Sequence, residues 1–467
     1  MTLNLDPKDT LYINSVYGND NINIEEGDEA GYGRGAENFD TKNSQFVLGL
    51  MLRSFWMKNL YSLFTLSGVS SNFFADVYEK PIPNIKDTYF TNESREAEYT
   101  LKSDFVYQVH KNLELNFGAS IKSVQFNYEI WDDADTLFVY DYMGTNPDAI
   151  IDTFKICPEL RIDRTFSSFK GALYAQVSLN FFKHFRLTSG VRYEYFDYNR
   201  FTSLSPRLGF SYFISPKMTF NLAYGKHYQS PAYIELVANS LNQGLKNKFT
   251  DQYIAGLEYL FRDDIKFVVE AYYKKYKDVP INKTLTTVDP FDFSDLRYVN
   301  AGTGEAKGIE LFFQKKITTG FSMIISYSHS VSQAKDPRFN TNYDWDYDYR
   351  NVLTFITGYK MDFRNKQWFV NMKHKWWFPV LSWLPFFPAD EVELSGKIRY
   401  LGGRPFTAPV YHPELKEWVV EEQQQLNAER FPTYHRLDFR IDCRFIFDTC
   451  NLVIFFDIVN IYNRDNI

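Results

Sequence analysis

Hydrophobic and polar residues alternate with a period of two along much of the chain. In one such segment the apolar positions are Ile265, Phe267, Val269, Ala271 and Tyr273, and the charged positions on the opposite side are Lys266, Glu270 and Lys274. Successive side chains of a β-strand point to opposite faces of the sheet. The pattern therefore predicts a strand with one apolar face and one charged face.

The same pattern recurs near the end of the sequence, where five successive charges share one face. These residues are Arg436, Asp438, Arg440, Asp442 and Arg444, and they alternate with apolar residues. A charged face of this length does not suit a soluble core, and runs of about ten residues match tilted membrane strands rather than the shorter strands of globular proteins. We therefore expect these five residues, with Lys266, Glu270 and Lys274, to face an aqueous lumen, while the apolar face contacts lipid.

Short and long links alternate between the expected strands. Met57–Asn59, Phe181–Lys183 and Arg262–Asp264 are short, whereas Glu79–Ala97 and Trp131–Phe166 are long. Membrane barrels have short turns at one end and long loops at the other. The sequence thus predicts an all-β fold, a transmembrane antiparallel β-barrel, with about sixteen strands.

One link on the short side does not fit this alternation. It runs from Asp362 to Glu391 and contains WWFPVLSWLPFFPA at residues 376–389. This run is too short and too rich in proline to cross a bilayer as a helix. It is either a packed loop or a segment in the membrane interface, where Trp is enriched.

Composition excludes several classes of protein. Aromatic residues make up 18% of the chain, but hydrophobic residues reach only 45% and the mean hydropathy is −0.37, which excludes a helical membrane protein. The net charge of −7 disfavours a nucleic-acid partner. Three scattered cysteines do not form a disulfide framework or a metal motif. No catalytic or cofactor motif is present, so we expect neither an enzyme nor a bound metal or cofactor.

Several strings in sequence order resemble the TonB-dependent outer-membrane receptors, specifically the barrel of Bacteroidetes-type members. They are SPRLGFSYFIS, YGKHYQSPAYIEL, KFTDQYIAGLEYLF, KFVVEAYYKKYKDVP, AKGIELFFQKK, DYDYRN, LGGRPFTAP, FPTYHRLDFRID and VNIYNRDNI. The resemblance covers about residues 166–467 well, and the first third only by pattern. Each string alone is weakly specific, but their order and strand phase are fairly specific.

The resemblance implies a 22-stranded barrel filled by an N-terminal plug, and this chain has room for neither the plug nor all the strands. We therefore expect residues 1–467 to form a partial barrel domain, a fragment of a longer gene product. Residues 1–43 are expected to be a loop or the end of a preceding strand, and residues 44–467 to hold strands and loops. An open reading frame that starts at Met1 and stops at Ile467 would contradict the fragment hypothesis.

The resemblance also implies a function and partners. It implies energised uptake of a scarce ligand, such as a siderophore, vitamin, oligosaccharide or peptide, across the outer membrane of a Gram-negative bacterium. The implied partners are outer-membrane lipid, the imported ligand and a TonB-type energy-coupling protein that acts through the plug. The resemblance also allows a surface lipoprotein as an additional partner. The competing hypotheses are a passive porin or channel, a barrel-based adhesin and a soluble all-β protein.

The first candidate ligand contacts lie in the string YDWDYDYR. Asp344, Asp346 and Asp348, with Arg350 in phase, would share one face of a strand. The simplest interpretation is a row of lumen charges balanced by neighbouring cations. Ligand contact and a calcium site are alternatives, although ligands on one straight strand rarely surround Ca²⁺.

Further candidates lie near the outer ends of strands. Arg404 follows two glycines that would allow a bend, and it could contact an anionic ligand or form a lumen ion pair. Tyr228 and Gln229 mark a strand exit and a second candidate contact. The resemblance does not favour haem, because haem-importing members of the family carry a histidine shortly after the box that contains Pro231, and no histidine lies between Pro231 and Asn242 here. The acidic, glycine-rich stretch Asn23–Asp40 is expected to be a solvated loop.

Overall fold

One large antiparallel sheet makes up most of the protein. A computed structural model describes residues 2–25, 38–82, 85–283, 296–337, 342–378, 389–420, 426–447 and 449–465. In this part of the chain nineteen strands form the sheet, and two of them, β1 and β17, have only three and two residues. The seventeen longer strands agree roughly with the number predicted from sequence.

The longer strands follow one another along the chain, and most pair with their sequence neighbours. Their bounds are β2 Asp9–Ile24, β3 Asn38–Met57, β4 Leu60–Ile82, β5 Ile85–His110, β6 Leu113–Asp132, β9 Leu160–Phe181, β10 Phe185–Phe196, β11 Phe201–Ser215, β12 Met218–Gln229, β13 Lys248–Arg262, β14 Ile265–Asn282, β15 Tyr298–Lys315, β16 Phe321–Lys335, β18 Asn351–Asp362, β19 Glu391–Leu401, β24 Tyr434–Ile446 and β25 Asn451–Ile458.

The remaining elements are short, and most lie in the loops. The short strands are β1 Thr2–Asn4, β7 Asp135–Tyr140, β8 Ile150–Cys157, β17 Tyr343–Asp344, β20 Pro405–Phe406, β21 Val410–His412, β22 Glu417–Val419 and β23 Glu429–Arg430. The helices are α1 Tyr233–Val237, the 3₁₀ helix η1 Ser240–Gly244 and α2 Gln367–Lys373. None of these helices is long and apolar enough to cross a membrane.

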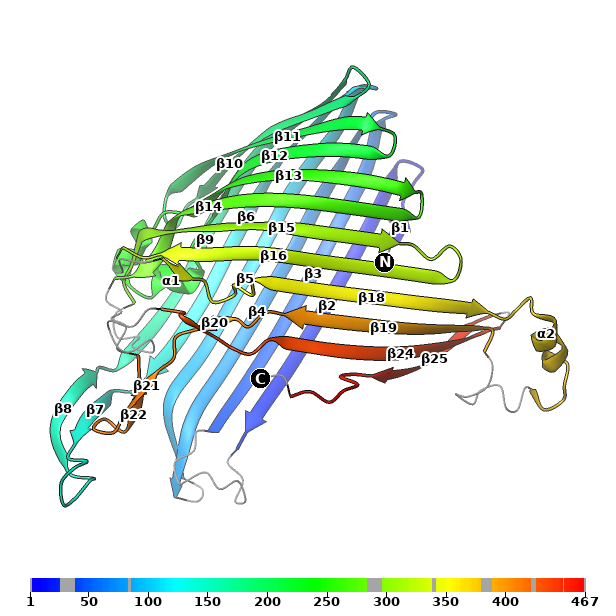
Figure 1. Cartoon of the computed structure of the whole chain (residues 1–467). Helices are drawn as coiled ribbons and strands as arrows, with labels where there is room; N and C mark the ends of the chain where they lie inside the picture. Colours follow the sequence, from blue (N-terminus) through cyan, green and yellow to red (C-terminus); the bar gives the residue numbers. More distant parts are fainter. Residues whose placement is uncertain are drawn as a thin grey trace.

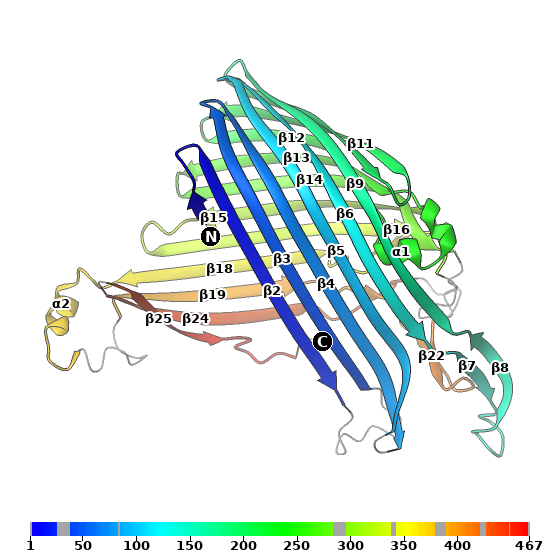
Figure 2. The same ribbon diagram turned by 180° about the vertical axis from the view of Figure 1, so that it is seen from behind.

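The sheet curls into two facing walls (Figure 1). Strands β2 to β9 form the wall at the back of this view, and strands β11 to β24 cross in front of it; Figure 2 shows the same arrangement from behind. In the described chain β25 pairs only with β24, and β2 only with β1 and β3, so the sheet stays open between these edges. Tight turns lie at one end, here called the short-turn end, and longer loops at the long-loop end.

Contacts of α1 identify the concave face of the sheet. This helix follows β12, yet it packs against side chains of β5, β6 and β9 in the other wall. A segment can reach both walls of a curled sheet only from the concave side. Phe126 on β6 and Lys170 on β9 therefore mark the concave face, and the ladder registers extend that assignment from strand to strand.

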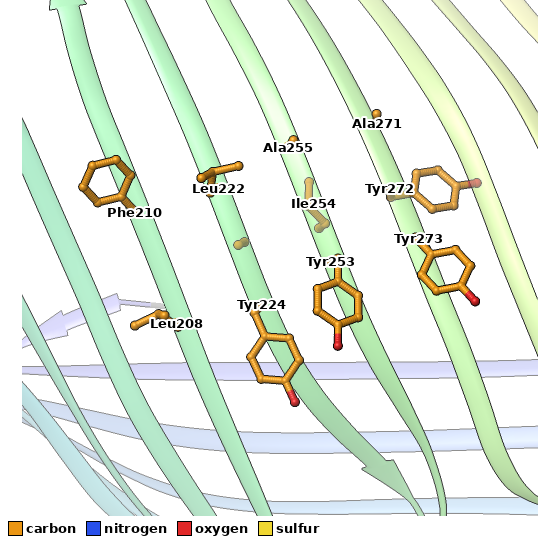
Figure 3. Close-up of a pocket in the computed structure, with 11 residues that line it drawn as sticks. Leu208, Phe210, Leu222, Tyr224, Tyr253, Ile254, Ala255, Ala271, Tyr272 and Tyr273 are labelled. Carbon is orange, nitrogen blue, oxygen red and sulfur yellow. The ribbon is translucent and has the colours of Figure 1, made fainter.

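The opposite, convex face carries a continuous apolar surface. Its residues align in register across four strands, so that Leu208 faces Tyr224, Tyr224 faces Tyr253, and Tyr253 faces Tyr273. Together with Phe210, Leu222, Ala255 and Ala271 they line a shallow apolar depression (Figure 3). The apolar face predicted for β14 therefore continues across β13, β12 and β11 as one surface, which suits lipid tails.

Two predictions about the first hundred residues are wrong. Residues 1–43 are not a loop or the end of one preceding strand, because they hold β1, the sixteen-residue β2 and the start of β3. The expected long loop Glu79–Ala97 is mostly strand, since β4 extends to Ile82 and β5 begins at Ile85. At the β4–β5 hairpin polar residues continue the strands beyond the apolar zone, where periodicity alone gives no apolar face to recognise. In β2 the alternating Leu11, Ile13 and Tyr17 do form an apolar face, and this signal was overlooked.

Two further predictions fall largely outside the described residues. Of the stretch Asn23–Asp40, the structure describes only the strand ends, and of residues 376–389 it describes Trp376, Trp377, Phe378 and Ala389. The prediction of an interfacial segment therefore stays a prediction.

Candidate ligand-binding site at the long-loop end

A tyrosine on α1 anchors this helix inside the curled sheet. The ring of Tyr233 stacks on Phe126, with 5.1 Å between ring centroids and 13° between ring planes. Its hydroxyl donates to Glu98 Oε1 at 2.5 Å and accepts from Lys170 Nζ at 2.8 Å. Burial, and then the bond to Glu98, raise the pKa of the Tyr233 phenol, so the hydroxyl keeps its proton and acts as a donor.

A buried asparagine of η1 connects α1 with the segment that leads into β15. The Asn242 side-chain amide donates to the carbonyl oxygens of Glu235 and Leu296, each at 2.7 Å, and its oxygen accepts from the backbone N–H of Tyr298 at 2.9 Å. Asn242 is fully buried, and its side chain satisfies backbone groups that the loop would otherwise leave without partners. The α1 segment is therefore part of a built structure and not a freely solvated loop.

A polar cavity of about 270 Å³ lies beside α1 on the concave face. Two of the predicted contact residues, Tyr228 and Gln229, line it. The other lining residues are Ser120, Lys122, Lys170, Gly171, Ala172, Arg192, Glu194, Tyr195, Phe196, Ser230 and Asn247. The structure thus brings the predicted strand exit together with charges from β6, β9 and β10.

The cavity carries charges of both signs. Lys122 pairs with Glu98 at 2.8 Å, and Arg192 donates through Nε to Glu194 at 2.8 Å. Lys170 donates to Ser230 Oγ at 3.2 Å, and its ammonium lies 4.4 Å from the ring centroid of Phe196. Such a surface offers donors, acceptors and an aromatic ring to a polar ligand.

The predicted strand geometry of Asp344, Asp346 and Asp348 is wrong. Strand β17 ends at Asp344, and the chain then turns, with the backbone N–H of Asp348 bonded to the carbonyl of Trp345 at 2.9 Å. The three carboxylates consequently do not share one face. Asp346 instead accepts a hydrogen bond from Asn427 at 2.7 Å. The short-range hydrogen bonds of this turn replace the sheet ladder that the alternating sequence suggested.

Asp344 and Asp348 converge on two arginines, in a group here called the Asp344–Arg430 cluster. Arg350 contacts Asp344 Oδ2 at 2.7 Å and Asp348 Oδ2 at 2.9 Å, and Arg430 contacts the same two oxygens at 2.5 and 2.9 Å. Arg430 belongs to β23, so the cluster joins the β16–β18 loop to the β19–β24 loop. These carboxylates already have cationic partners, and the described residues hold no group of three His, Cys, Asp or Glu side chains suited to a metal ion.

Two glycines bring the backbone close enough for this cluster to form. A Cβ atom on Gly403 would lie 1.6 Å from the carbonyl oxygen of Phe431, and one on Gly402 would lie 2.1 Å from that of Tyr349. Arg430 then donates to the carbonyl oxygen of Gly403 at 2.9 Å. The glycines were predicted to allow a bend, and the structure shows close packing of two chain segments there.

Arg404 does not form the lumen ion pair that was one of its predicted roles. Its guanidinium is exposed and lies 5.0 Å from the ring centroid of Phe431, and no carboxylate of the described residues pairs with it. The other predicted role, contact with an anionic ligand, therefore stays a prediction.

The ladder registers place all eight predicted lumen residues on the concave face. Starting from Phe196 and Arg192, the pairing runs through Gly256 to Glu270, with Lys266 and Lys274 on the same side of β14. It continues through β15, β16, β18 and β19 to the five charges of β24.

Most of these concave charges pair locally. Lys266 pairs with Glu258 at 2.8 Å, and the ammonium of Lys274 lies 4.7 Å from the ring centroid of Tyr272. On β24, Arg436 pairs with Asp438, Arg440 with Asp442, and Arg444 with Glu391 of β19, at 2.8, 2.6 and 3.7 Å.

Two hairpins from opposite walls meet across the long-loop end (Figure 1). Strands β7 and β8 lie between β6 and β9, whereas β21 and β22 lie between β19 and β24. The backbone N–H of Tyr140 donates to the carbonyl of Glu414 at 2.6 Å, Lys416 pairs with Asp148, and the Lys416 ammonium lies 4.2 Å from the Tyr140 ring centroid. We call these contacts the hairpin clasp.

Sequence reasoning missed Tyr233, Glu98, Lys170 and Arg430, which organise these contacts. Tyr233 stands two residues after Pro231 in YQSPAY. This proline follows the end of β12 at Gln229, and it was a signal that the chain turns inward there. No local signal could connect Tyr233 with Glu98, because 135 residues separate them in the chain.

Taken together, the fold and this site define the wall of a transmembrane antiparallel β-barrel, with a polar inner face, an apolar outer face and a polar cavity at its long-loop end. The sequence of residues 2–461 matches the family described as TonB dependent receptor-like, beta-barrel. The chain belongs to that family.

Solved structures show the same fold. The outer membrane transporter YddB from Escherichia coli has a TM-score of 0.65 at 12% identity, with 99% of this chain and 64% of that chain covered. The ferric yersiniabactin uptake receptor FyuA from Yersinia pestis gives 0.63 at 11%, covering 98% and 64%.

A mutant of the ferric enterobactin receptor PfeA from Pseudomonas aeruginosa gives 0.61 at 13%, covering 99% and 63%. This chain therefore spans less than two thirds of the length of these receptors. No curated protein sequence matches the chain.

Proposed function

We propose that this chain forms the barrel wall and extracellular loops of a receptor for energised uptake of a scarce polar ligand across the outer membrane of a Gram-negative bacterium. The long-loop end faces outward in this proposal, and the short-turn end faces the periplasm. The family supports it, and the single observation that carries it is the polar cavity beside α1. A TonB-type energy-coupling protein acting on a plug within the barrel would supply the force.

The cavity chemistry supports a ligand with several hydrogen-bonding groups. Lys122, Lys170 and Arg192 supply donors, and Glu194 and Gln229 supply acceptors. Siderophores, vitamins, oligosaccharides and peptides all satisfy this description. FyuA is a ferric yersiniabactin uptake receptor and PfeA is a ferric enterobactin receptor, and their likeness to this chain is one of fold.

An uptake experiment tests the proposal and separates it from a passive channel. Cells that express the full-length receptor are given a panel of radiolabelled ferric siderophores, cyanocobalamin, oligosaccharides and peptides, with and without a protonophore. We expect one compound to accumulate against its gradient, and the protonophore to abolish that accumulation. Entry that only equilibrates and ignores the protonophore would establish the passive channel instead.

A variant of the cavity adds a second comparison. Lys170→Gln removes the ammonium that bonds Ser230 and Tyr233, and it should lower uptake at low ligand concentration at least about tenfold, because charged hydrogen bonds are among the stronger ones. Lys183→Gln, in the short turn between β9 and β10, is the matched control and should transport like wild type. Equal uptake by Lys170→Gln and wild type would remove the cavity from the proposal.

A further inference from the structure

A row of polar residues crosses the convex face, on the side that carries the apolar surface. The registers align Asn19 of β2 with Ser44, Ser44 with Asn72, Asn72 with Arg95, and Arg95 with Asn127. Asn127 then faces Thr165 of β9. Six strands therefore contribute one polar side chain each to a single level, and this row was not recognised in the sequence.

The row lies above an apolar row on the same strands. Leu66, Leu101 and Ile121 are aligned with one another and are more than half exposed. Each stands six residues from the polar residue of its strand, so it lies on the same face, about 20 Å away along the strand. The surface thus changes from mainly apolar to mainly polar within one continuous sheet.

Exposed aromatic residues mark the boundary between the two zones. Tyr99 on β5 and Phe169 on β9 are exposed by 46% and 43%, and each stands four residues below the polar row. Aromatic residues of this kind gather at the membrane interface. Four residues of a tilted strand rise about 10 Å, whereas the headgroup layer of a leaflet is about 5–7 Å thick. The polar row therefore lies beyond the headgroup layer of phospholipids.

The polar row lines a groove of about 360 Å³. Its walls include Asn19, Ser44, Asn72, Arg95 and Asn127, and the aligned residues Lys42, Phe74 and Glu93 form the next level on the same face. Asn72 donates to Ser44 at 3.2 Å and Thr165 donates to Asn127 at 2.5 Å, which fixes two of the amides. Arg95 is exposed, and no carboxylate of the described residues pairs with it.

These groups favour hydroxyl-rich ligands over simple phosphate. Amides offer both donors and acceptors, and a guanidinium offers five donors, which suits closely spaced hydroxyl groups. A site for phosphate alone would be uniformly basic, but Lys42 pairs with Asp40 at 3.1 Å, and Glu93 and Glu129 lie on the same face as Arg95. Phe74 adds an aromatic surface, with the Lys42 ammonium 5.1 Å from its ring centroid.

We infer that this groove binds the saccharide headgroup of a glycolipid in the surrounding outer leaflet. The occupant is anchored in the leaflet because the groove continues directly from the lipid-facing surface, and its headgroup is a saccharide because the groove lies beyond the reach of a phospholipid headgroup. The inference rests on the proposed location in the outer membrane and goes beyond uptake of the transported ligand.

Lipid-binding measurements on the full chain in lipid nanodiscs test the inference. Three probes are compared by native mass spectrometry and titration: lipopolysaccharide with its core oligosaccharide, lipid A without the core, and the free core oligosaccharide. We expect tight binding of intact lipopolysaccharide and at least about tenfold weaker binding of the other two. Equal binding of lipid A, or of the free saccharide, would overturn the glycolipid assignment.

Variants connect the binding to the groove. Arg95→Gln combined with Asn127→Leu should weaken lipopolysaccharide binding at least about tenfold, because it removes the guanidinium and one fixed amide. The control is Arg262→Gln at the short-turn end, whose side chain is 67% exposed and which should bind like wild type. Unchanged binding by the double variant would overturn the site.

A spin label at Leu101 reports membrane insertion separately. If this label is in lipid but no probe binds, the groove inference fails while the membrane location stands. If the label is in water, the proposed membrane location is wrong, and the groove inference, which rests on it, is wrong as well.

Discussion

The hydroxyl of Tyr233 donates a hydrogen bond of 2.5 Å to Glu98, which lies in the opposite wall of the curled sheet. This contact connects the segment after β12 with β5, so it holds α1 across the interior. Glu98 is also paired with Lys122, and Lys170 donates to the same tyrosine hydroxyl. The position of α1, and with it the shape of the polar cavity, therefore depends on a small network at one point.

Tyr233→Phe tests this network, because it keeps the ring stacked on Phe126 and removes only the hydroxyl. We expect α1 to open more readily by about 1.5–3 kcal/mol, the usual contribution of a hydrogen bond to a charged group. Hydrogen–deuterium exchange of residues 233–237 should become at least about tenfold faster. Tyr347→Phe, at a side chain that is 77% exposed, is the control and should exchange like wild type. Exchange that is unchanged in Tyr233→Phe would show that packing alone holds α1.

Acid should loosen the Asp344–Arg430 cluster. Burial alone would raise the pKa of Asp344, but hydrogen bonds from Arg350, Gln333 and Arg430 outweigh it and hold the pKa below the ordinary value of an aspartate. A carboxyl whose pKa is lowered by folding stabilises the folded state above its unfolded pKa, and this stabilisation is lost as the pH falls through the folded pKa.

Limited proteolysis of the β19–β24 loop should therefore stay slow at neutral pH and become faster below about pH 4. In Asp344→Asn, proteolysis should already be fast at neutral pH and should change much less across this range. An acid-induced change of the same size in Asp344→Asn and wild type would assign the effect to another group.

Gly403→Ala should disrupt the same loop without touching a charge. The added methyl group would lie 1.6 Å from the carbonyl oxygen of Phe431, so the backbone must move. We expect a local loss of about 1–3 kcal/mol, typical of overpacking, and about tenfold faster proteolysis of the loop. Gly49→Ala on β3 is the control, because its Cβ would meet nothing within 4 Å. Wild-type resistance to proteolysis in Gly403→Ala would contradict the close packing described here.

A cross-link across the hairpin clasp tests whether the two hairpins must separate for uptake. Asp148→Cys with Lys416→Cys, in a background without native cysteines, should be joined by a reducible thiol-reactive cross-linker, because the ends of the original side chains are in contact. We expect the cross-link to block uptake and a reductant to restore it. Asp148→Cys with Lys183→Cys should not cross-link, since Lys183 lies in a turn at the short-turn end. Normal uptake through the cross-linked receptor would show that ligand enters without opening the clasp.

The sequence was most informative where one physical pattern decides the structure. Alternation along β14 and β24 predicted which residues share a face, because a strand has a strict period of two. The positions of Lys266 and Arg440 on one face follow directly from this. Each strand could be predicted independently, and the ladders bring the faces into register.

The sequence was less informative about segments outside the apolar zone. Asp344, Asp346 and Asp348 alternate as a strand would, but the arginine partners of Asp344 and Asp348 include Arg430, which lies 86 residues from Asp344. Ion pairs between distant loops override local alternation, and no pattern near Asp344 announces Arg430. The tip of the β4–β5 hairpin was missed for a related reason, since polar residues there continue the strands in water and resemble a loop.

The central claim is that the apolar convex face contacts lipid and the polar concave face contacts water. Nitroxide labels at Phe267 and Lys266, adjacent positions on opposite faces of β14, test it most directly in the receptor reconstituted into a bilayer. We expect dissolved oxygen to relax the label at 267 and a water-soluble nickel complex to relax the label at 266. Two labels that both respond to nickel and not to oxygen would contradict the membrane barrel and the transport function proposed for it.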